Sequence, residues 1–400
     1  MAGLYIHIPF CKRKCRYCDF ISFPDFAHED LYFVALISEM RKYAPLMRGR
    51  AFDTVFFGGG TPTALKPGRI AALLDEVRKC FDISPDAEIT CEANPESATE
   101  EKVRELYSAG VNRLSIGLQS ASDAELSAIG RIHTREDFLR ALEAARKAGF
   151  TNINADVMHG LPGQTCESYL NTLRFVTELD IPHISSYALI LEEGTPLYGA
   201  VKEGREELPD PDETADMEDA GFAFLAENGY GRYEISNFAK PGFECRHNLN
   251  YWDNGEYLGI GLNSHSALRL KGEWTRFCNT AVLSEYVSEL GEGKLPVRDT
   301  RRIERDEEMF ESIMLGLRKT EGISRADFEV SVFCVARGNV NPDGHLSFCA
   351  MIASDAICPC AELGSISYIL RYVSNAALSC DVSDCARARA SSASRRIALG

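Results

Sequence analysis

The first half of the chain alternates short runs of β-branched and apolar residues with longer amphipathic stretches. In the longer stretches, apolar positions recur at i, i+3, i+4 and i+7, the spacing of a helix with one buried face. The pattern predicts strands at Leu4–Ile8, Thr54–Phe57, Glu88–Glu92, Arg113–Gly117, Asn152–Val157 and Ile184–Leu189. It predicts helices between them at Asp30–Tyr43, Pro67–Cys80, Glu101–Ala109, Arg135–Ala148 and Ser168–Leu179.

Such alternation favours parallel strands covered by helices. Six strand–helix units predict an α/β fold, an open partial (β/α)6 barrel that is TIM-like but two units short of the complete barrel. We assign this barrel to residues 1–200 and a smaller α+β region to residues 201–328, where helices are expected at 212–228 and 305–317. In barrels of this type, ligands gather at the C-terminal ends of the strands.

Small and polar residues lie where the predicted strands end. They are Cys11, the loop Gly58–Pro62, Glu92, Gln119, Asp156 and Ala188, after or near the ends of strands one to six in that order. Glycines let the backbone approach a ligand closely, and the loop is not a P-loop because no Gly-Lys-Ser/Thr follows. A carboxylate at a strand end can accept hydrogen bonds from ribose hydroxyls. The pattern indicates a ligand site at this rim.

Three cysteines, Cys11, Cys15 and Cys18, follow the first strand with Cys-x3-Cys-x2-Cys spacing. Soft thiolates suit iron–sulfur clusters and zinc. Three ligands leave one iron of a [4Fe–4S] cluster open, and that iron can bind the amine and carboxylate groups of S-adenosylmethionine (SAM). The alternative is a structural zinc module, although zinc usually takes four ligands, often from paired cysteines.

The charge balance narrows the classes of partner. Lys and Arg number 43 against 59 Asp and Glu, a formal net charge of −16, which disfavours a non-specific nucleic-acid binder. No stretch approaches the roughly 20 apolar residues of a membrane helix, and no secretory signal is recognisable. We therefore expect a reducing cytoplasm, in which metal ligation is favoured over disulfides for the 14 cysteines.

A second unusual constellation is Cys245-Arg246-His247-Asn248-Leu249-Asn250-Tyr251-Trp252. His and Cys are common axial ligands of haem iron, and neighbouring aromatic rings can sandwich a porphyrin. The alternative is a hydrogen-bonded core histidine at position 247.

Seven stretches within residues 1–328 together resemble the radical SAM superfamily, and within it the branch of oxygen-independent coproporphyrinogen III oxidases and HemW-type haem chaperones. They are IHIPFCKRKCRYCDF, FFGGGTPT, AEITCEANPES, GVNRLSIGLQS, IGRIHT, MHGLPGQT and KPGFECRHNLNYW. The resemblance implies that Cys11, Cys15 and Cys18 hold a [4Fe–4S] cluster. It implies SAM contacts from Tyr5, Tyr17, Gly59, Gly60, Thr61, Glu92, Gln119, Arg131, Asp156 and Ala188, and haem ligation by His247.

Three features favour the chaperones over the oxidases. The pattern of the oxidases is Cys-x3-Cys-x2-Cys-x-Cys, and in this chain Phe20 occupies the position of the fourth cysteine. The HNxxYW signature associated with haem in the chaperones is present from His247 to Trp252, and the N-terminal arm of the oxidases is lacking. The expected function is haem binding and transfer to an acceptor protein of unknown identity; the alternative is radical decarboxylation of coproporphyrinogen III.

The resemblance also bears on partners and location. If SAM is cleaved, an electron donor such as ferredoxin or flavodoxin is required. The resemblance also allows peripheral association of the protein with a membrane during haem delivery.

The resemblance stops near residue 329. The last 71 residues contain no lysine, six cysteines, twelve alanines and eleven serines. We interpret residues 329–400 as an aberrant tail that is frameshifted or disordered, and its cysteines are not expected to be metal ligands.

Overall fold

The computed structural model describes residues 2–324 and 345–346. Residues up to Glu304 form one compact unit, and those from Arg305 onward form a second. The second unit contains helix α11 (Arg305–Gly316) and the antiparallel strands β13 (Ile323–Ser324) and β14 (His345–Leu346). Apart from β14, the tail predicted at 329–400 lies outside the described residues. The predicted domain boundaries at residues 200 and 328 stay predictions.

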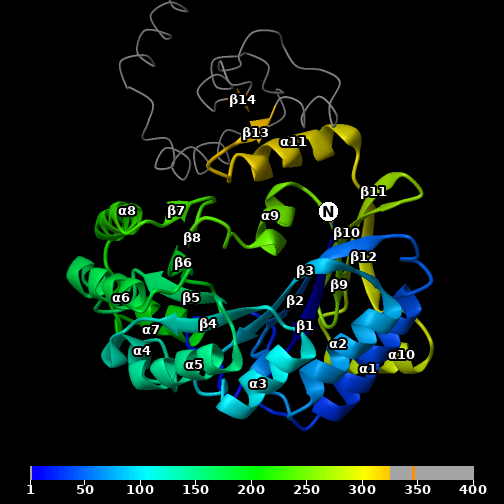
Figure 1. Cartoon of the computed structure of the whole chain (residues 1–400), viewed down its shortest axis with the longest axis horizontal. Coiled ribbons are helices and arrows are strands. Elements are labelled where there is room, and N and C mark those ends of the chain that lie inside the picture. The colour runs from blue at the N-terminus through cyan, green and yellow to red at the C-terminus, as the bar shows by residue number, and fades with distance from the viewer. Residues whose placement is uncertain (1, 325–344, 347–400) are drawn as a thin grey trace, which may run out of the picture. The chain divides into compact units, whose positions relative to one another are not determined.

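Six parallel strands form the centre of the first unit (Figure 1). They are β1 (Ala2–Ile8), β2 (Ala51–Gly59), β3 (Asp82–Ala93), β4 (Arg113–Gln119), β5 (Asn152–His159) and β6 (His183–Ala188). The predicted connecting helices are present as α1 (Glu29–Tyr43), α2 (Arg69–Cys80), α3 (Glu100–Ala109), α5 (Arg135–Ala148) and α6 (Cys166–Glu178). The predicted α/β fold with an open partial barrel is confirmed.

The sheet extends beyond these six strands at both edges. Beside β1 lie β9 (Glu256–Ile260), β10 (His265–Leu270), β11 (Glu273–Asn279) and β12 (Val297–Arg302); beside β6 lie β8 (Asn237–Ala239) and β7 (Gly231–Arg232). Strand β9 runs parallel to β1, and Tyr5 is paired with Gly259. The sequence patterns missed β9 to β12, because a glycine interrupts the apolar run of β9 and charged residues dominate β12.

Of the further helices, only α8 (Pro211–Glu227) was predicted. The others are α4 (Asp123–Ala128), α7 (Pro196–Lys202), α9 (Arg246–Trp252) and α10 (Leu283–Gly291), together with the short 3-10 helix η1 (Pro62–Ala64). Within the described ranges, no helix combines the length and apolar character needed to cross a membrane.

Local sequence signals fix the helix ends. Thr134 and Asp137 form a capping box at the start of α5, which satisfies backbone N–H groups that have no partner within the helix. Gly110 and Gly149 end α3 and α5 in the left-handed conformation, where a side chain would be strained. These caps set where the chain leaves each helix and enters the next strand.

Alternation along the strands gives the central sheet one apolar and one polar face. In β4, Leu114 and Ile116 are fully buried on the side covered by helices, and helices α2, α5 and α6 contact β3, β4 and β5. Positions of the opposite parity form the inner face, which carries Glu92, Ser115 and Asp156. Register places Glu92 beside Ser115, so residues far apart in sequence become neighbours on this face.

Candidate functional site

The cysteine loop connects β1 to α1 and carries Cys11, Cys15 and Cys18. Its backbone is held by the amide of Cys11, which donates to Phe23 O at 3.0 Å, and by the amide of Cys18, which donates to Cys15 O at 3.3 Å. Cys11 is buried, whereas Cys15 and Cys18 are half-buried. The loop therefore holds two partly accessible thiols beside a buried one.

Two of the three thiols, Cys11 and Cys18, lie in surroundings that favour their neutral form without a metal. Burial raises the pKa of Cys11 and Cys18, while the Thr61 hydroxyl donates to Cys11 Sγ at 3.4 Å. No three His, Cys, Asp or Glu side chains of the described ranges converge on a point that suits a single metal ion. A cubane does not require such convergence, because each of three thiolates binds a different iron.

The glycine loop after β2 is tied to the cysteine loop. The amide of Gly60 donates to Ile8 O at 2.8 Å, and the amide of Thr61 donates to Phe10 O at 2.7 Å. A Cβ atom on Gly60 would lie 2.7 Å from Phe10 O, and one on Gly59 would lie 2.4 Å from the His7 ring. Both glycines are therefore required for the two loops to approach this closely.

Two carboxylates, Glu92 and Asp156, lie on the inner face near the strand ends. Burial, followed by the charge of Asp156, raises the pKa of Glu92 to about 7, and burial also raises the pKa of Asp156. Glu92 accepts a hydrogen bond from the amide of Gly59 at 3.1 Å, and Asp156 accepts one from Asn154 Nδ2 at 2.7 Å. Both side chains are only half-buried in strands that are otherwise largely buried, so both remain open to a ligand.

Arg131 brings a positive charge to the same region. Its Nη1 donates to Asn94 Oδ1 at 2.7 Å and its Nη2 to Tyr17 OH at 3.0 Å, whereas its buried Nε has no hydrogen-bond partner among the residues that the structure describes. Gln119, whose φ of 68° is unusual for a residue with a side chain, accepts from Tyr187 OH at 3.1 Å. An unpaired guanidinium nitrogen is a donor that a bound carboxylate can satisfy.

Tyr5 and Ala188 complete the predicted set. The half-buried Tyr5 lies on β1, with its hydroxyl 3.1 Å from Nδ1 of His7, and Ala188 ends β6 in register with His159. The donors of this region fit a [4Fe–4S] cluster with SAM: three thiols, a glycine loop, two half-buried carboxylates and an arginine with a free donor.

The predicted haem motif forms α9, and His247 lies within it, 1% exposed. Its Nδ1 is 2.7 Å from Thr54 Oγ1, its Nε2 is 2.9 Å from Tyr251 OH, and Phe56 stacks on its ring at 5.0 Å between centroids. Burial lowers the pKa of His247 to about 3, so the ring is neutral. Both ring nitrogens are occupied, and iron ligation requires one of these hydrogen bonds to break.

Several inner-face residues were missed by the sequence reasoning, notably Glu88, Asn94, Arg113 and Tyr187. Arg113 and Glu88 are 2% and 6% exposed, and both share strand parity with residues that were predicted. Parity along β3 and β4 was the signal available for these two, whereas the prediction considered mainly strand ends.

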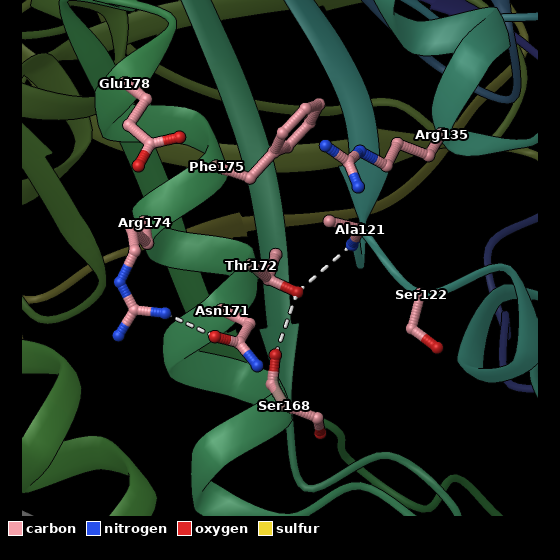
Figure 2. A pocket seen from close by; sticks show the side chains of 9 residues that line it. All are labelled: Ala121, Ser122, Arg135, Ser168, Asn171, Thr172, Arg174, Phe175 and Glu178. Atoms are coloured by element: carbon pink, nitrogen blue, oxygen red, sulfur yellow. Dashed lines mark hydrogen bonds between the residues drawn. The ribbon is translucent and has the colours of Figure 1, made fainter.

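A surface pocket of about 490 Å³ lies elsewhere, beside α6 (Figure 2). Figure 2 shows Arg135 and Arg174 at its edges, and the ring of Phe175 lies 4.3 Å from the Arg135 guanidinium. None of the residues predicted for the cluster, SAM or haem lines this pocket.

Comparisons with known proteins extend over most of the chain. A profile of the Radical SAM superfamily matches residues 5–176. The chain is 39% identical over 330 residues to "Heme chaperone HemW" of Bacillus subtilis, which covers 82% of this chain and 86% of that protein. It is likewise 39% identical over 330 residues to that of Escherichia coli, covering 82% and 85%.

Among solved structures, coproporphyrinogen III oxidase (HemN) from Escherichia coli, described as a radical SAM enzyme, is similar with a TM-score of 0.72 and 28% identity, covering 82% of this chain and 78% of that one. These similarities, unlike the superfamily profile, reach well past the first six strands.

Proposed function

The chain belongs to the HemW family within the radical SAM superfamily, and from this premise we propose that it binds haem and transfers it to an acceptor protein while carrying a [4Fe–4S] cluster with exchangeable SAM. The observation that carries the proposal is the cysteine loop, which holds three thiols. Phe20, 64% exposed, occupies the position at which the oxidase pattern has a fourth cysteine.

In this proposal, Cys11, Cys15 and Cys18 hold the cluster as thiolates. When bound, the cluster offers its fourth iron to the amine and carboxylate of SAM. Binding iron removes the thiol protons, which burial otherwise favours for Cys11 and Cys18.

The remaining residues orient and neutralise SAM. Glu92 and Asp156 supply negative charge for a cationic ligand and accept hydrogen bonds from its hydroxyl groups. The Nε of Arg131, unpaired within the described residues, donates a hydrogen bond to the ligand's carboxylate. Gly59 and Gly60 keep the backbone close to the cysteine loop. Tyr5, Tyr17, Thr61, Gln119 and Ala188 line the same region.

Haem is proposed to bind at α9. A neutral imidazole is the form that ligates iron, and the lowered pKa of His247 keeps it neutral. Because Nε2 is bonded to Tyr251 OH, haem binding exchanges that hydrogen bond for an iron–nitrogen bond. The ring of Phe56, stacked on His247, limits how far the imidazole can turn.

The alternative is decarboxylation of coproporphyrinogen III, which the similarity to HemN favours. One experiment separates the two functions: anaerobic purification and cluster reconstitution, then haem titration and a coproporphyrinogen turnover assay. Stoichiometric haem binding without protoporphyrinogen supports the chaperone, and turnover overturns it. His247→Ala should weaken haem binding, whereas His265→Ala, a change at an exposed histidine, should not.

The same proposal includes a cytoplasmic location and peripheral association with a membrane during haem delivery. It also includes a ferredoxin or flavodoxin as the electron donor if SAM is cleaved.

A further inference from the structure

A continuous series of hydrogen bonds links Asp156 on the inner face to the first residue before α9. Asp156 Oδ1 is 2.7 Å from Asn154 Nδ2, and Asn154 Oδ1 is 2.6 Å from Nδ1 of His183. Nε2 of His183 is 2.8 Å from Tyr233 OH, and the tyrosine oxygen accepts a hydrogen bond from the amide of Cys245 at 3.1 Å. We call these five residues the coupling chain.

The coupling chain has a single direction. Asn154 Nδ2 also donates to Ser115 Oγ at 2.7 Å, so its amide oxygen faces His183. An oxygen accepts only, hence Nδ1 of His183 carries the proton, Nε2 accepts from Tyr233 OH, and the tyrosine oxygen accepts from Cys245. Every donor therefore points from α9 toward the carboxylate of Asp156. Hydrogen bonds aligned in this way polarise and strengthen one another.

A second connection reaches the same end of α9. Glu88 accepts from the amides of Arg246 and His247 at 3.0 and 3.1 Å. Arg113, which begins β4 and is 2% exposed, interacts electrostatically with Glu88, Asp156 and Cys245. One buried positive charge is thus shared by the carboxylate that caps α9 and the carboxylate assigned to SAM.

Burying this many polar groups is costly unless each is satisfied, and apolar packing would hold the strands without them. What the arrangement adds is a connection between two ligand regions. We propose that His183 and Tyr233 are positioning residues that couple SAM at Asp156 to the N-terminus of α9, so that SAM tightens haem binding. The proposal rests on the function proposed above, since it takes SAM and haem as the ligands.

The expected direction follows from charge. SAM is a sulfonium cation, and a cation near Asp156 favours its ionised form. An ionised carboxylate accepts a stronger hydrogen bond from Asn154 than a neutral one, and the alignment of the coupling chain carries this change to the amide of Cys245. The first turn of α9, which includes His247, then opens less often. By linkage, haem tightens SAM by the same factor.

The test uses the full chain with its reconstituted cluster and follows backbone hydrogen exchange of residues 245–252 with and without SAM, in the absence of haem. SAM should slow exchange of this segment at least fivefold in the unmodified protein, which is the lower end of typical coupling factors of about 5- to 150-fold. Tyr233→Phe should remove the SAM effect while leaving SAM binding, measured by equilibrium dialysis, intact. His183→Phe is a second variant that breaks the same series.

Tyr230→Phe is the matched control, because the buried Tyr230 lies three residues before the half-buried Tyr233 and donates its hydroxyl to Ile181 O, outside the coupling chain. A SAM effect that persists in both Tyr233→Phe and His183→Phe, or one absent from the unmodified protein that binds SAM, overturns the proposal. A purely structural role for Tyr233 would change exchange equally with and without SAM, which also overturns it.

A parallel haem titration should show tighter binding with SAM in the unmodified protein and the Tyr230→Phe control, and no SAM dependence in Tyr233→Phe. Failure of all haem binding refutes the proposed function, while the exchange result still decides the coupling to α9.

Discussion

At the scale of single residues, two cysteines with similar exposure lie in different surroundings. Cys15 and Cys166 are both half-buried thiols, but only Cys15 lies in the loop held against the glycine segment. Position within the loop, rather than thiol exposure, is therefore what should decide cluster binding.

We expect Cys15→Ala to abolish the cluster and Cys166→Ala to retain it, because a cubane bound by two thiolates has two unprotected irons. Iron and acid-labile sulfide per chain after anaerobic reconstitution measure the difference. Full iron and sulfide in Cys15→Ala would remove this residue from the ligand set.

The second residue-scale prediction concerns Tyr251. Because its hydroxyl occupies Nε2 of His247, Tyr251→Phe should raise haem affinity, since the competing hydrogen bond no longer has to break. One hydrogen bond of about 0.5–1.5 kcal/mol corresponds to a haem Kd that is lower by roughly 2- to 12-fold. Haem titration monitored by absorbance measures the gain.

Tyr43→Phe serves as the control for that titration, because within the described part of the chain the buried Tyr43 hydroxyl has no hydrogen-bond partner. Weaker haem binding in Tyr251→Phe would indicate that the tyrosine itself contacts the haem or its iron.

At the scale of elements, the glycine loop after β2 depends on the absence of a side chain. A methyl group at Gly60 meets backbone atoms of Phe10 and Ile8, and backbone cannot move aside as a flexible side chain can. Gly60→Ala should lower the free energy of unfolding by about 1–3 kcal/mol and reduce cluster loading by displacing the cysteine loop.

Gly199→Ala is the comparison, because no described atom beyond its chain neighbours and the backbone of α7 lies within 4 Å of the added methyl group. It should be neutral or stabilising by up to about 1 kcal/mol. Chemical denaturation and iron content of both variants decide the matter; equal stability and loading in the two would contradict the proposed fit of the loops.

The same scale shows what sequence could predict. Strands β1 to β6 were predictable because helix and strand periods alternate along the chain, and Glu92 and Asp156 because they lie at strand ends. Arg113 begins its strand, so reasoning from strand ends missed it; parity along β4 was the local signal, but its charge partners Glu88 and Asp156 come from other strands. Strand β9 was not predictable, because its pairing with β1 joins residues some 250 positions apart and leaves no local pattern.

At the scale of the first unit as a whole, a buried acid links distant parts of the chain. Glu39 on α1 is fully buried and accepts from Asn279 Nδ2 at 2.6 Å, the amide of Gly261 at 2.9 Å, and Tyr286 OH. Burial raises the pKa of Glu39 to about 7. These bonds join α1 to β11, α10 and the turn after β9.

This acid predicts a pH dependence of stability. A raised pKa means that the folded state holds the proton more tightly than the unfolded state, whose value is about 4.3. The contribution of the proton is therefore complete below pH ~4 and lost as the pH rises through 7, a change of about 3 kcal/mol as an order of magnitude.

Urea denaturation between pH 5 and 8 should show a smaller decline in the free energy of unfolding for Glu39→Gln than for the unmodified protein. The difference between the two isolates Glu39 from Glu92, which titrates in the same range. Parallel pH profiles would indicate that Glu39 stays charged when folded.

The pairing of β1 with β9 also has a consequence for synthesis on the ribosome. The strand that leads into the cysteine loop is made first, yet one of its two neighbours, Glu256–Ile260, is made last among its partners. Until that segment leaves the ribosomal exit tunnel, β1 has an open edge and the loop is supported from one side only. We therefore expect the proposed cluster to be held stably only after β9 has been made, although β9 supplies none of the three proposed thiolate ligands.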